Sequence, residues 1–487
     1  MWDFRRADWD RLKVAIKEYR SGEMLNEAHF DESVEKFCNH LCELALRFVP
    51  KKIILNRQNA HPWLDEECFV AIEAKCLATS RDDFFEKQRQ CAEVLCRKFK
   101  EYQEALKDRI RKLPSSSKLW WKYNRELLNR KSKNTTIPHL KAGDGSWRLS
   151  SIDKANLLAD TFQGKCRLPP GEWRPEREER CHPAMPEFHL IRYRWASQII
   201  KALDVDKACG PDLLPIRLFK ECVKELSPSL AVLTRFWLRC RRWPRRWRLH
   251  WVHPFYKKSS VSQPSNYRGI HLTSVISKIA ERMIARILTQ FLDRTSAYGM
   301  DQWAFRPKRS CRDLVALLVL RWIWALDNGF KIAIYLSDIS GAFDKVDSEI
   351  LVIRLRNTGA SECLCDFIKD YLAPRSAVVL VQSMQSTPFL IENQIFQGTV
   401  LGPPLWNTFF KSIDTPILEK AFRGAKFADD LTAYKNFESS TPNAEILDKL
   451  RDVQIHVHSW GHKHRVTFDS ISASCIEQIV AAKRSNY

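Results

Sequence analysis

No stretch of the sequence approaches the roughly 20 consecutive apolar residues that a membrane-spanning helix requires. A basic and apolar N-terminal leader with a cleavage site is also absent. These two absences argue against a membrane partner and predict an intracellular protein, nuclear or cytoplasmic. With 487 residues, the chain is long enough for two or three domains and a sizeable buried core.

The sequence also lacks the cysteine framework of a disulfide-rich protein. Its 15 cysteines are scattered without regular spacing. In a chain without an export signal, they are better explained as reduced thiols and small core residues. We find no internal repeat of about 20 to 50 residues and no low-complexity tract, so a repeat array is not expected.

Positive charge is in clear excess. The 79 Lys and Arg residues outnumber the 58 Asp and Glu residues, which leaves a net charge of +21. A polyanion is the expected partner, and nucleic acid fits best because Lys and Arg side chains that neutralise phosphates release condensed counterions. The alternative is that the excess charge serves only solubility.

The first part of the chain is predicted to be helical. Apolar residues recur at helical spacing along residues 82–113, and Pro114 with the serines that follow it ends this segment. We assign residues 1–150 to a helical, basic extension. Residues 151–190 are assigned to a helix followed by a proline-rich linker, at residues 168–186.

Beyond this linker, helical and strand patterns alternate. Their mixture predicts an α+β or α/β domain that fills the rest of the chain. Helices are expected at residues 212–240, 273–293, 311–327 and 444–459, and strands at residues 331–337, 376–382 and 423–428.

Three aspartates lie where predicted strands end. Asp338 follows the strand at residues 331–337, and small residues come soon after it. In the run KFADDLTAY, Asp429 and Asp430 lie between two short strands, so both carboxylates are expected at the tip of a hairpin. Taken alone, an Asp-Asp pair is also compatible with an ordinary turn.

Carboxylates that are held together repel, and one pKa is usually raised unless a cation lies between them. Hard oxygen ligands, with coordination positions left for water and phosphates, are what Mg²⁺ prefers. If Asp338 lies beside the hairpin, three carboxylates can hold two Mg²⁺ ions about 4 Å apart, with Mn²⁺ as a substitute. Such a site is suited to nucleotidyl transfer.

Seven blocks between residues 210 and 430 accompany these aspartates. Their order and gaps resemble those of the reverse transcriptases of non-LTR (LINE-type) retrotransposons, over residues 195–470. The blocks are GPDLLPIRLFK (210–220), WVHPFYKK (251–258), NYRGIHLTSVISKIAERMI (266–284), AYGMDQWAFRPKRSCRDL (297–314), SDISGAFDKVD (337–347), FQGTVLGPPLW (396–406) and FADD (427–430).

The resemblance implies an α+β right-hand polymerase and assigns roles to matching positions. Asp338, Asp429 and Asp430 would be the catalytic carboxylates and metal ligands. Phe343 would lie under the sugar and exclude a 2′-OH, so deoxynucleotides are expected. The other positions would bind the incoming nucleotide: Gly341 and Ala342 through backbone N–H groups, Gln397 and Gly398 beside the template, and Lys258 and Arg268 at the triphosphate.

The same resemblance divides the chain into fingers at residues 191–330 and a palm at residues 331–487, with the thumb missing or truncated. It further implies that this chain lacks the endonuclease that an autonomous element needs. Residues 470–472 are Ser, Ile and Ser, where the family has a lysine proposed to protonate pyrophosphate. Slower chemistry is therefore expected.

The expected function is that of an RNA-directed DNA polymerase. Its partners would be an RNA template, a DNA primer or target DNA, and dNTPs. One alternative is a catalytically inactive RNA- or DNA-binding remnant that keeps the fold. Another is an RNA-dependent RNA polymerase, which is disfavoured by Phe343 and by Ala428, where such enzymes usually carry glycine.

Two further segments leave alternatives open. Residues 237–258, the Trp/Arg segment, interleave four Trp with six Arg. This composition suits stacking on nucleic-acid bases, but the tryptophans could equally pack in a core while the arginines are solvated. The run HVHSWGHKH at residues 456–464 has four histidines, but their spacing is not a standard zinc pattern.

Overall fold

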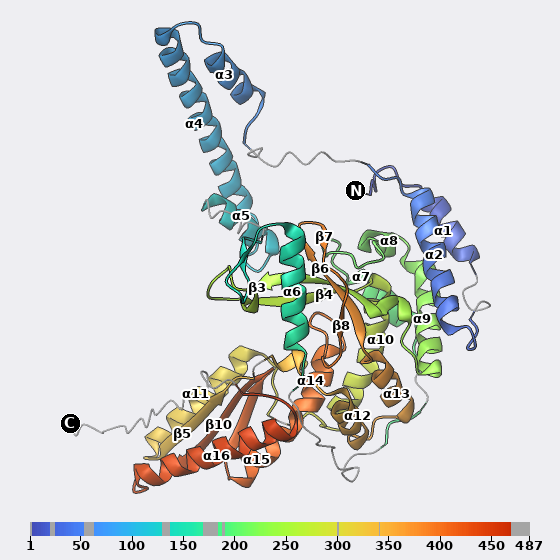
Figure 1. The fold of residues 1–487 in the computed structure, drawn as a ribbon, viewed down its shortest axis with the longest axis vertical. Coiled ribbons are helices and arrows are strands. Elements are labelled where there is room, and N and C mark those ends of the chain that lie inside the picture. The colour runs from blue at the N-terminus through green and yellow to red at the C-terminus, as the bar shows by residue number, and fades with distance from the viewer. Residues whose placement is uncertain are drawn as a thin grey trace. The chain divides into compact units, whose positions relative to one another are not determined.

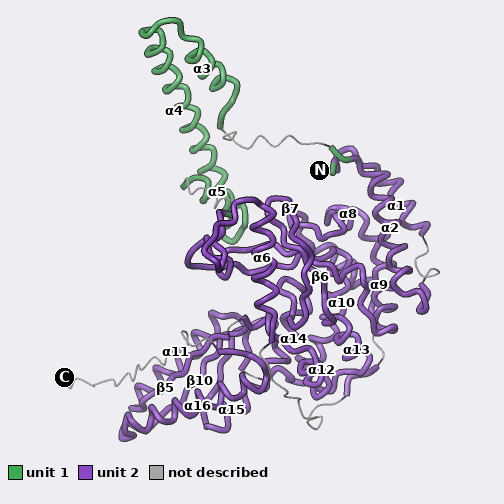
Figure 2. Tube along the Cα trace, viewed as in Figure 1, with its two compact units in different colours: residues 1–2, 51–137 green, residues 3–50, 138–487 purple. Residues whose placement is uncertain are grey.

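The computed structural model places most of the chain in two compact units, which we describe separately (Figure 2). Residues 51–137 with the first two residues form the smaller unit, and residues 3–50 with 138–487 form the larger one. Most of the proline-rich linker predicted at residues 168–186 lies outside the described residues. The structure describes residues 2–19, 25–52, 63–128, 137–168, 184–187, 190–299, 301–339 and 341–468.

The smaller unit consists of three helices, α3 (Glu66–Cys76), α4 (Arg81–Arg111) and α5 (Lys118–Leu127). Each begins after a residue whose side chain accepts a hydrogen bond from the first turn, as Ser80 does from the backbone N–H of Asp83. The helix predicted at residues 82–113 is thereby confirmed as α4. Only Cys91 and Leu106 of this 31-residue helix are fully buried.

The larger unit mixes helices with two main sheets, so its fold is α+β (Figure 1). A three-stranded antiparallel sheet has the order β5 (Lys331–Ser337), β10 (Asp430–Phe437), β9 (Arg423–Phe427). The five-stranded sheet has the order β4 (Tyr267–Leu272), β3 (Leu249–Tyr256), β6 (Arg375–Val381), β7 (Met384–Gln385), with β8 (Phe389–Ile391) also paired to β6. A separate two-stranded hairpin joins β1 (Leu140–Lys141) and β2 (Trp147–Arg148).

Helices surround these sheets, and most of the predicted elements are found. The predicted strands correspond to β5, β6 and β9, and the four predicted helices are present, the first of them as two. The helices are α1 (Trp9–Glu18), α2 (Phe30–Phe48), α6 (Ser151–Lys165), α7 (Tyr193–Lys201), α8 (Ile216–Glu221), α9 (Val223–Cys240), α10 (Val275–Arg294), α11 (Cys311–Asp327), α12 (Ser348–Asn357), α13 (Glu362–Tyr371), α14 (Gly402–Phe410), α15 (Asp414–Glu419) and α16 (Asn443–Lys463).

The compact units do not follow the predicted boundary at residue 150. Residues 3–50 belong to the larger unit because the apolar face of α2 is buried there. Phe30 of α2 stacks on Phe236 of α9, with ring centroids 5.3 Å apart.

The five-stranded sheet contains strands from both sides of the predicted division at residue 330, and the three-stranded sheet is covered by a helix that precedes it. Strand β6, which lies beyond this position in sequence, pairs in parallel with β3. Helix α11, which precedes it, packs through Leu314 and Leu318 against Tyr434 of the three-stranded sheet. Parallel pairing requires a long crossover connection, so the sheet that contains β3 and β6 cannot be a contiguous segment of the sequence.

The Trp/Arg segment is part of the protein's own core. Trp237, Trp243 and Trp247 are at most 4% exposed and contact one another, with ring centroids 4.7–6.1 Å apart. These three rings therefore cannot stack on bases, and the core-packing alternative is correct for them. The six arginines each contact an acidic or amide side chain: Arg239–Glu27, Arg241–Asp366, Arg242–Asp31, Arg245–Asp31, Arg246–Asn39 and Arg248–Asp370.

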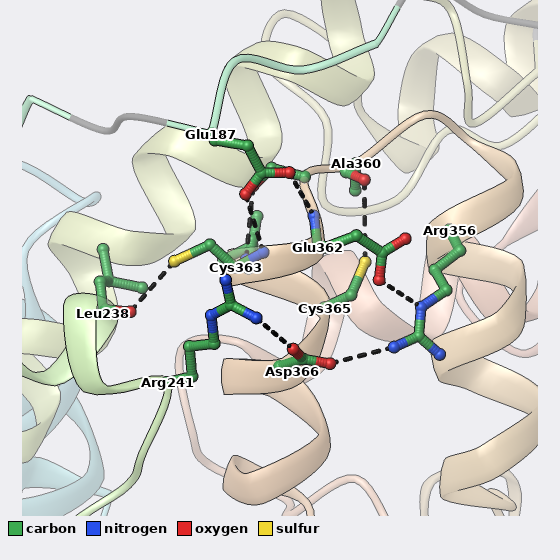
Figure 3. Close-up of polar contacts among 11 residues, drawn as sticks. Glu187, Leu238, Arg241, Arg356, Ala360, Glu362, Cys363, Cys365 and Asp366 are labelled. Carbon is green, nitrogen blue, oxygen red and sulfur yellow. Dashed lines mark hydrogen bonds and ion pairs between the residues drawn. The ribbon is translucent and has the colours of Figure 1, made fainter.

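Figure 3 shows how one of these arginines joins two helices. Arg241 follows α9 and contacts Asp366 of α13, which also accepts a hydrogen bond from Arg356 of α12. At the start of α13, the carboxylate of Glu187 accepts hydrogen bonds from the backbone N–H groups of Glu362 and Cys363, at 2.9 and 3.0 Å. The charged groups here are used to fasten helices together.

Three expectations about the rest of the chain can be compared with the described ranges. The thirteen cysteines in these ranges are all free thiols. None of the described helices is both long and apolar enough to cross a bilayer. The histidine run falls at the end of α16, where His464 is buried and stacks on Trp460 at a centroid distance of 4.4 Å.

Candidate active site

The three predicted aspartates meet at one edge of the three-stranded sheet. β9 and β10 form a hairpin in which Phe427 pairs with Asp430, so that Ala428 and Asp429 make a two-residue turn. We call residues 423–437 the carboxylate hairpin. Because Leu431 of β10 pairs with Ser337 of β5, Asp338 follows directly beside Asp430. The expected meeting of the end of β5 with residues 429–430 is confirmed.

The pKa values of Asp429 and Asp430 are both raised. Burial raises the pKa of Asp429, and the charge of Asp338 adds to the effect, while Arg268 and Lys257 oppose it. The pKa of Asp430 is also raised, mainly by burial and then by Asp429 and Asp338. The folded protein therefore concentrates negative charge here at a cost that a bound cation would relieve.

A cleft of about 860 Å³ opens beside these carboxylates. Most of the predicted site residues line it, although they come from distant parts of the sequence; Asp430 and Lys258 are not among its lining residues. The predicted residues that line the cleft are Arg268, Asp338, Gly341, Ala342, Phe343, Gln397, Gly398 and Asp429.

Two glycines let the backbone approach the cleft closely. Gly341 has φ +70° and begins a short 3₁₀ turn, residues 342–344. Gly398 has φ +96°, and a Cβ added there would lie 3.2 Å from the backbone oxygen of His271. The carbonyl of Gln397 accepts a hydrogen bond from the N–H of His271 at 2.9 Å, which fastens this loop to β4. Substitution of either glycine would therefore strain the wall of the cleft.

Phe343 lies on the cleft against a buried tryptophan of α14. Its ring stacks on that of Trp406 with a centroid distance of 5.4 Å and an interplanar angle of 20°. The backbone oxygen of Phe343 accepts a hydrogen bond from the N–H of Ile395 at 2.9 Å. Both contacts fix the position of the ring.

The sequence reasoning missed five charged residues on the cleft: Lys165, Arg167, Lys257, Asp344 and Lys345. Lys257, which directly follows β3, lines the cleft in place of the predicted Lys258, and no local sequence pattern distinguishes the two. Asp344 follows Phe343 in the same block, and burial raises its pKa to about 6. Lys165, at the end of α6, donates hydrogen bonds to the backbone oxygens of Ser265 and Tyr267, and no local sequence pattern marks it.

The donor set can be compared with the needs of Mg²⁺. Within the described ranges, no group of three or more His, Cys, Asp or Glu side chains is arranged so that it could hold an ion. Mg²⁺ is often held by only one or two carboxylates together with substrate phosphates, and Asp338 and Asp429 both line the cleft. The residues fit such a shared site, and the three-carboxylate set stays a prediction.

Comparisons with known proteins point to the same part of the chain. Residues 256–469 match the family model "Reverse transcriptase (RNA-dependent DNA polymerase)". This match includes both β5 and the carboxylate hairpin. The chain contains a reverse transcriptase domain.

Similar curated proteins come from mobile elements of Drosophila melanogaster, and they support the resemblance to the LINE-type reverse transcriptases. The chain is 25% identical to the RNA-directed DNA polymerase from mobile element jockey over 71% of its own length and 40% of the relative. It is 24% identical to the probable RNA-directed DNA polymerase from transposon X-element, over 72% of its own length and 39% of the relative. It is 26% identical to the probable RNA-directed DNA polymerase from transposon BS, over 46% of its own length and 25% of the relative.

The reverse transcriptase domain of this chain thus corresponds to part of longer relatives, since the chain spans between a quarter and two-fifths of their length. Lys165 of α6 lies on the cleft but outside the matched residues 256–469. Residues before the matched segment therefore contribute to the candidate active site.

Proposed function

We propose that the chain is the polymerase core of a non-LTR retrotransposon and synthesises DNA on an RNA template. The observation that carries this proposal is the meeting of Asp338 with Asp429 and Asp430 at a cleft that also holds Lys165, Lys257 and Arg268. The carboxylates are suited to hold Mg²⁺, and the cations are suited to neutralise a triphosphate. In this proposal, the larger unit supplies the fingers and the palm of a right-hand polymerase.

The chemistry would be a nucleotidyl transfer. The primer 3′-oxygen forms a bond to the α-phosphorus of a dNTP while the bond to pyrophosphate breaks. Two bound Mg²⁺ ions would activate the hydroxyl group and stabilise the leaving oxygen. The protein would bind the triphosphate through Lys257, Arg268 and the backbone N–H groups of Gly341 and Ala342, and this positioning would supply most of the rate.

A primer-extension assay tests this proposal. We expect the full chain, given an RNA template, a DNA primer, dNTPs and Mg²⁺, to extend the primer. Asp338→Asn and the double variant Asp429→Ala, Asp430→Ala should lower the rate by about a thousandfold or more, because metal ligands are lost. Asp206→Asn, in an exposed loop, is the matched control and should extend normally.

Equal extension by the aspartate variants would refute the assignment. Binding of RNA that weakens with salt, without any product from the wild-type chain, would instead select the inactive remnant.

Sugar selectivity provides a second test. Phe343 is held against Trp406 at the cleft, where its ring could exclude a 2′-OH. Phe343→Ala should increase incorporation of ribonucleotides relative to deoxynucleotides by at least about tenfold, since a steric block is removed. Phe343→Tyr, which keeps the ring, should retain the preference for dNTPs. Unchanged selectivity in Phe343→Ala would remove this role.

A further inference from the structure

The turn that carries Asp429 has an unfavourable backbone conformation. Ala428 has φ +60°, in the left-handed region that residues with a Cβ rarely adopt. It is the first residue of a two-residue hairpin turn, where such a φ belongs to the type II′ geometry that favours glycine. Neighbouring groups must therefore hold the turn in place, because the residue itself does not prefer this conformation.

A single side chain holds both polar backbone groups of Ala428. The Oε1 atom of Gln302 accepts a hydrogen bond from the N–H of Ala428 at 3.1 Å, and its Nε2 atom donates to the carbonyl of Ala428 at 3.2 Å. The same Oε1 atom also accepts from the N–H of Ala304 at 3.0 Å, which fixes the orientation of the amide. Gln302 is only 1% exposed, so water does not compete for these bonds.

Gln302 is itself attached to the hairpin that it holds. The N–H of Trp303 donates to the carbonyl of Lys426, and the N–H of Lys426 donates to the carbonyl of Asp301, at 2.9 and 2.7 Å. The segment around Gln302 therefore runs alongside β9. The amide is presented to Ala428 by backbone pairing, which limits its freedom to move.

Trp406 provides the second contact to the same residue. Its Nε1 atom donates to the carbonyl of Ala428 at 3.0 Å, and the side chain is fully buried in α14. The same indole ring stacks on Phe343. One side chain thus contacts both the turn that carries Asp429 and the ring expected to face the sugar.

We propose that Gln302 and Trp406 are positioning residues that hold Ala428 in its left-handed conformation and thereby aim the Asp429 carboxylate into the cleft. This inference rests on the proposed function, since Asp429 is taken as a metal ligand. Neither residue touches the substrate in this proposal. Their effect passes through the backbone of the turn.

Rescue by glycine separates positioning from general stability. Gln302→Ala should lower kcat for primer extension by about a hundredfold with less than about a threefold change in KM for dNTP, because misplaced catalytic groups slow the chemical step. Ala428→Gly adopts the required φ without a side-chain penalty. Added to Gln302→Ala, it should restore at least about tenfold of the lost kcat. No rescue in a folded double variant would overturn the proposal.

Trp406→Phe tests the second contact, with Trp460→Phe as a matched control. Both substitutions keep a buried aromatic ring and remove one indole N–H; that of Trp460 donates to Ser412 at 2.9 Å, away from Ala428. Trp406→Phe should lower kcat by about tenfold, the size expected for one lost hydrogen bond in a buried site. Trp460→Phe should lower the melting temperature similarly but leave kcat within about twofold. An equal loss of kcat in both would overturn the proposal.

Binding of Mn²⁺, followed by electron paramagnetic resonance, gives a readout that does not depend on turnover. Gln302→Ala should weaken Mn²⁺ binding by about tenfold, and Ala428→Gly should restore it. If this pattern appears although the wild-type chain extends no primer, the positioning role of Gln302 is supported and the polymerase proposal fails. If extension is normal in the wild type and Mn²⁺ affinity is the same in all folded variants, the positioning proposal is wrong and the polymerase proposal stands.

Discussion

The Trp/Arg segment and the carboxylate hairpin both concentrate charge, but they neutralise it in different ways. Each arginine of the Trp/Arg segment contacts an acidic or amide side chain supplied by the protein. At the hairpin, Asp429 and Asp430 are brought together with Asp338, and burial and like charge raise their pKa values. Charged groups that the protein pairs with its own opposite charges stabilise the fold. Like charges that lie together at a cleft without such partners indicate a ligand site.

Composition alone would have favoured the Trp/Arg segment over the carboxylate hairpin as a ligand site. The tryptophans and arginines form a conspicuous run, while the Asp-Asp pair is a common dipeptide. Burial decides between them, since Trp237, Trp243 and Trp247 are enclosed in the core and Asp429 lines the cleft. The difference can be tested by removing one aspartate that contacts the Trp/Arg segment and one aspartate of the carboxylate hairpin.

The largest effect on stability is expected in the Trp/Arg segment. Both carboxylate oxygens of Asp370 accept hydrogen bonds from Arg248 at 2.8 Å, and one also accepts from the N–H of Trp243. Asp370→Ala would leave these half-buried donors without a partner, so we expect a loss of about 2–3 kcal/mol in the free energy of unfolding. Urea denaturation would measure it.

An exposed pair in the same region serves as the control. Glu27 contacts Arg239 at 2.7 Å, but both side chains are more than 60% exposed. Glu27→Ala should therefore cost less than about 1 kcal/mol. A loss in Asp370→Ala no larger than in Glu27→Ala would contradict the view that the protein uses these arginines as internal fasteners.

At the carboxylate hairpin, removal of an aspartate is expected to increase the free energy of unfolding instead of lowering it. Because burial and Asp338 raise the pKa of Asp429, the ionised carboxylate destabilises the folded protein when no metal is bound. Asp429→Asn removes this penalty and should stabilise the chain by up to about 1 kcal/mol at neutral pH, while primer extension is lost.

The pH dependence identifies the cause of this gain. Wild-type stability contributed by the neutral Asp429 is fully present below the unfolded pKa of about 3.9 and is lost as the pH rises through the raised folded value. The advantage of Asp429→Asn should therefore grow with pH when both proteins are unfolded with urea in the presence of a chelator. A difference that does not grow as the pH rises from about 3 to neutral would show that Asp429 is not under electrostatic strain.

Local patterns in the sequence were sufficient to predict the ends of the elements that carry the aspartates. The apolar run before Asp338 matches β5, and the short strands around Asp429 and Asp430 form the predicted hairpin. The meeting of these two elements followed from the resemblance and from the chemistry of paired carboxylates. Such features depend on residues that are close in sequence or on roles that are shared by a family.

Contacts between distant segments could not be predicted in this way. Gln302 reaches Ala428 across 126 positions of sequence, and Lys165 reaches Tyr267 across 102. The parallel pairing of β3 with β6 is equally non-local, and it joins segments from both sides of residue 330. Periodicity reports which face of an element is buried, but it does not report which element covers that face.

The smallest expected effect distinguishes two adjacent lysines. Sequence reasoning assigned Lys258 to the triphosphate, whereas Lys257 lines the cleft and acts on Asp429 and Asp430. Lys257 directly follows β3, whereas Lys258 lies in the bend that comes next and does not line the cleft. Lys257→Ala should raise KM for dNTP by about threefold, the size of one partly solvated charge contact, and Lys258→Ala should leave it nearly unchanged. Steady-state primer extension at constant ionic strength would measure both. If Lys258→Ala has the larger effect, Lys258 rather than Lys257 binds the triphosphate, and the basic wall of the cleft must be reassigned.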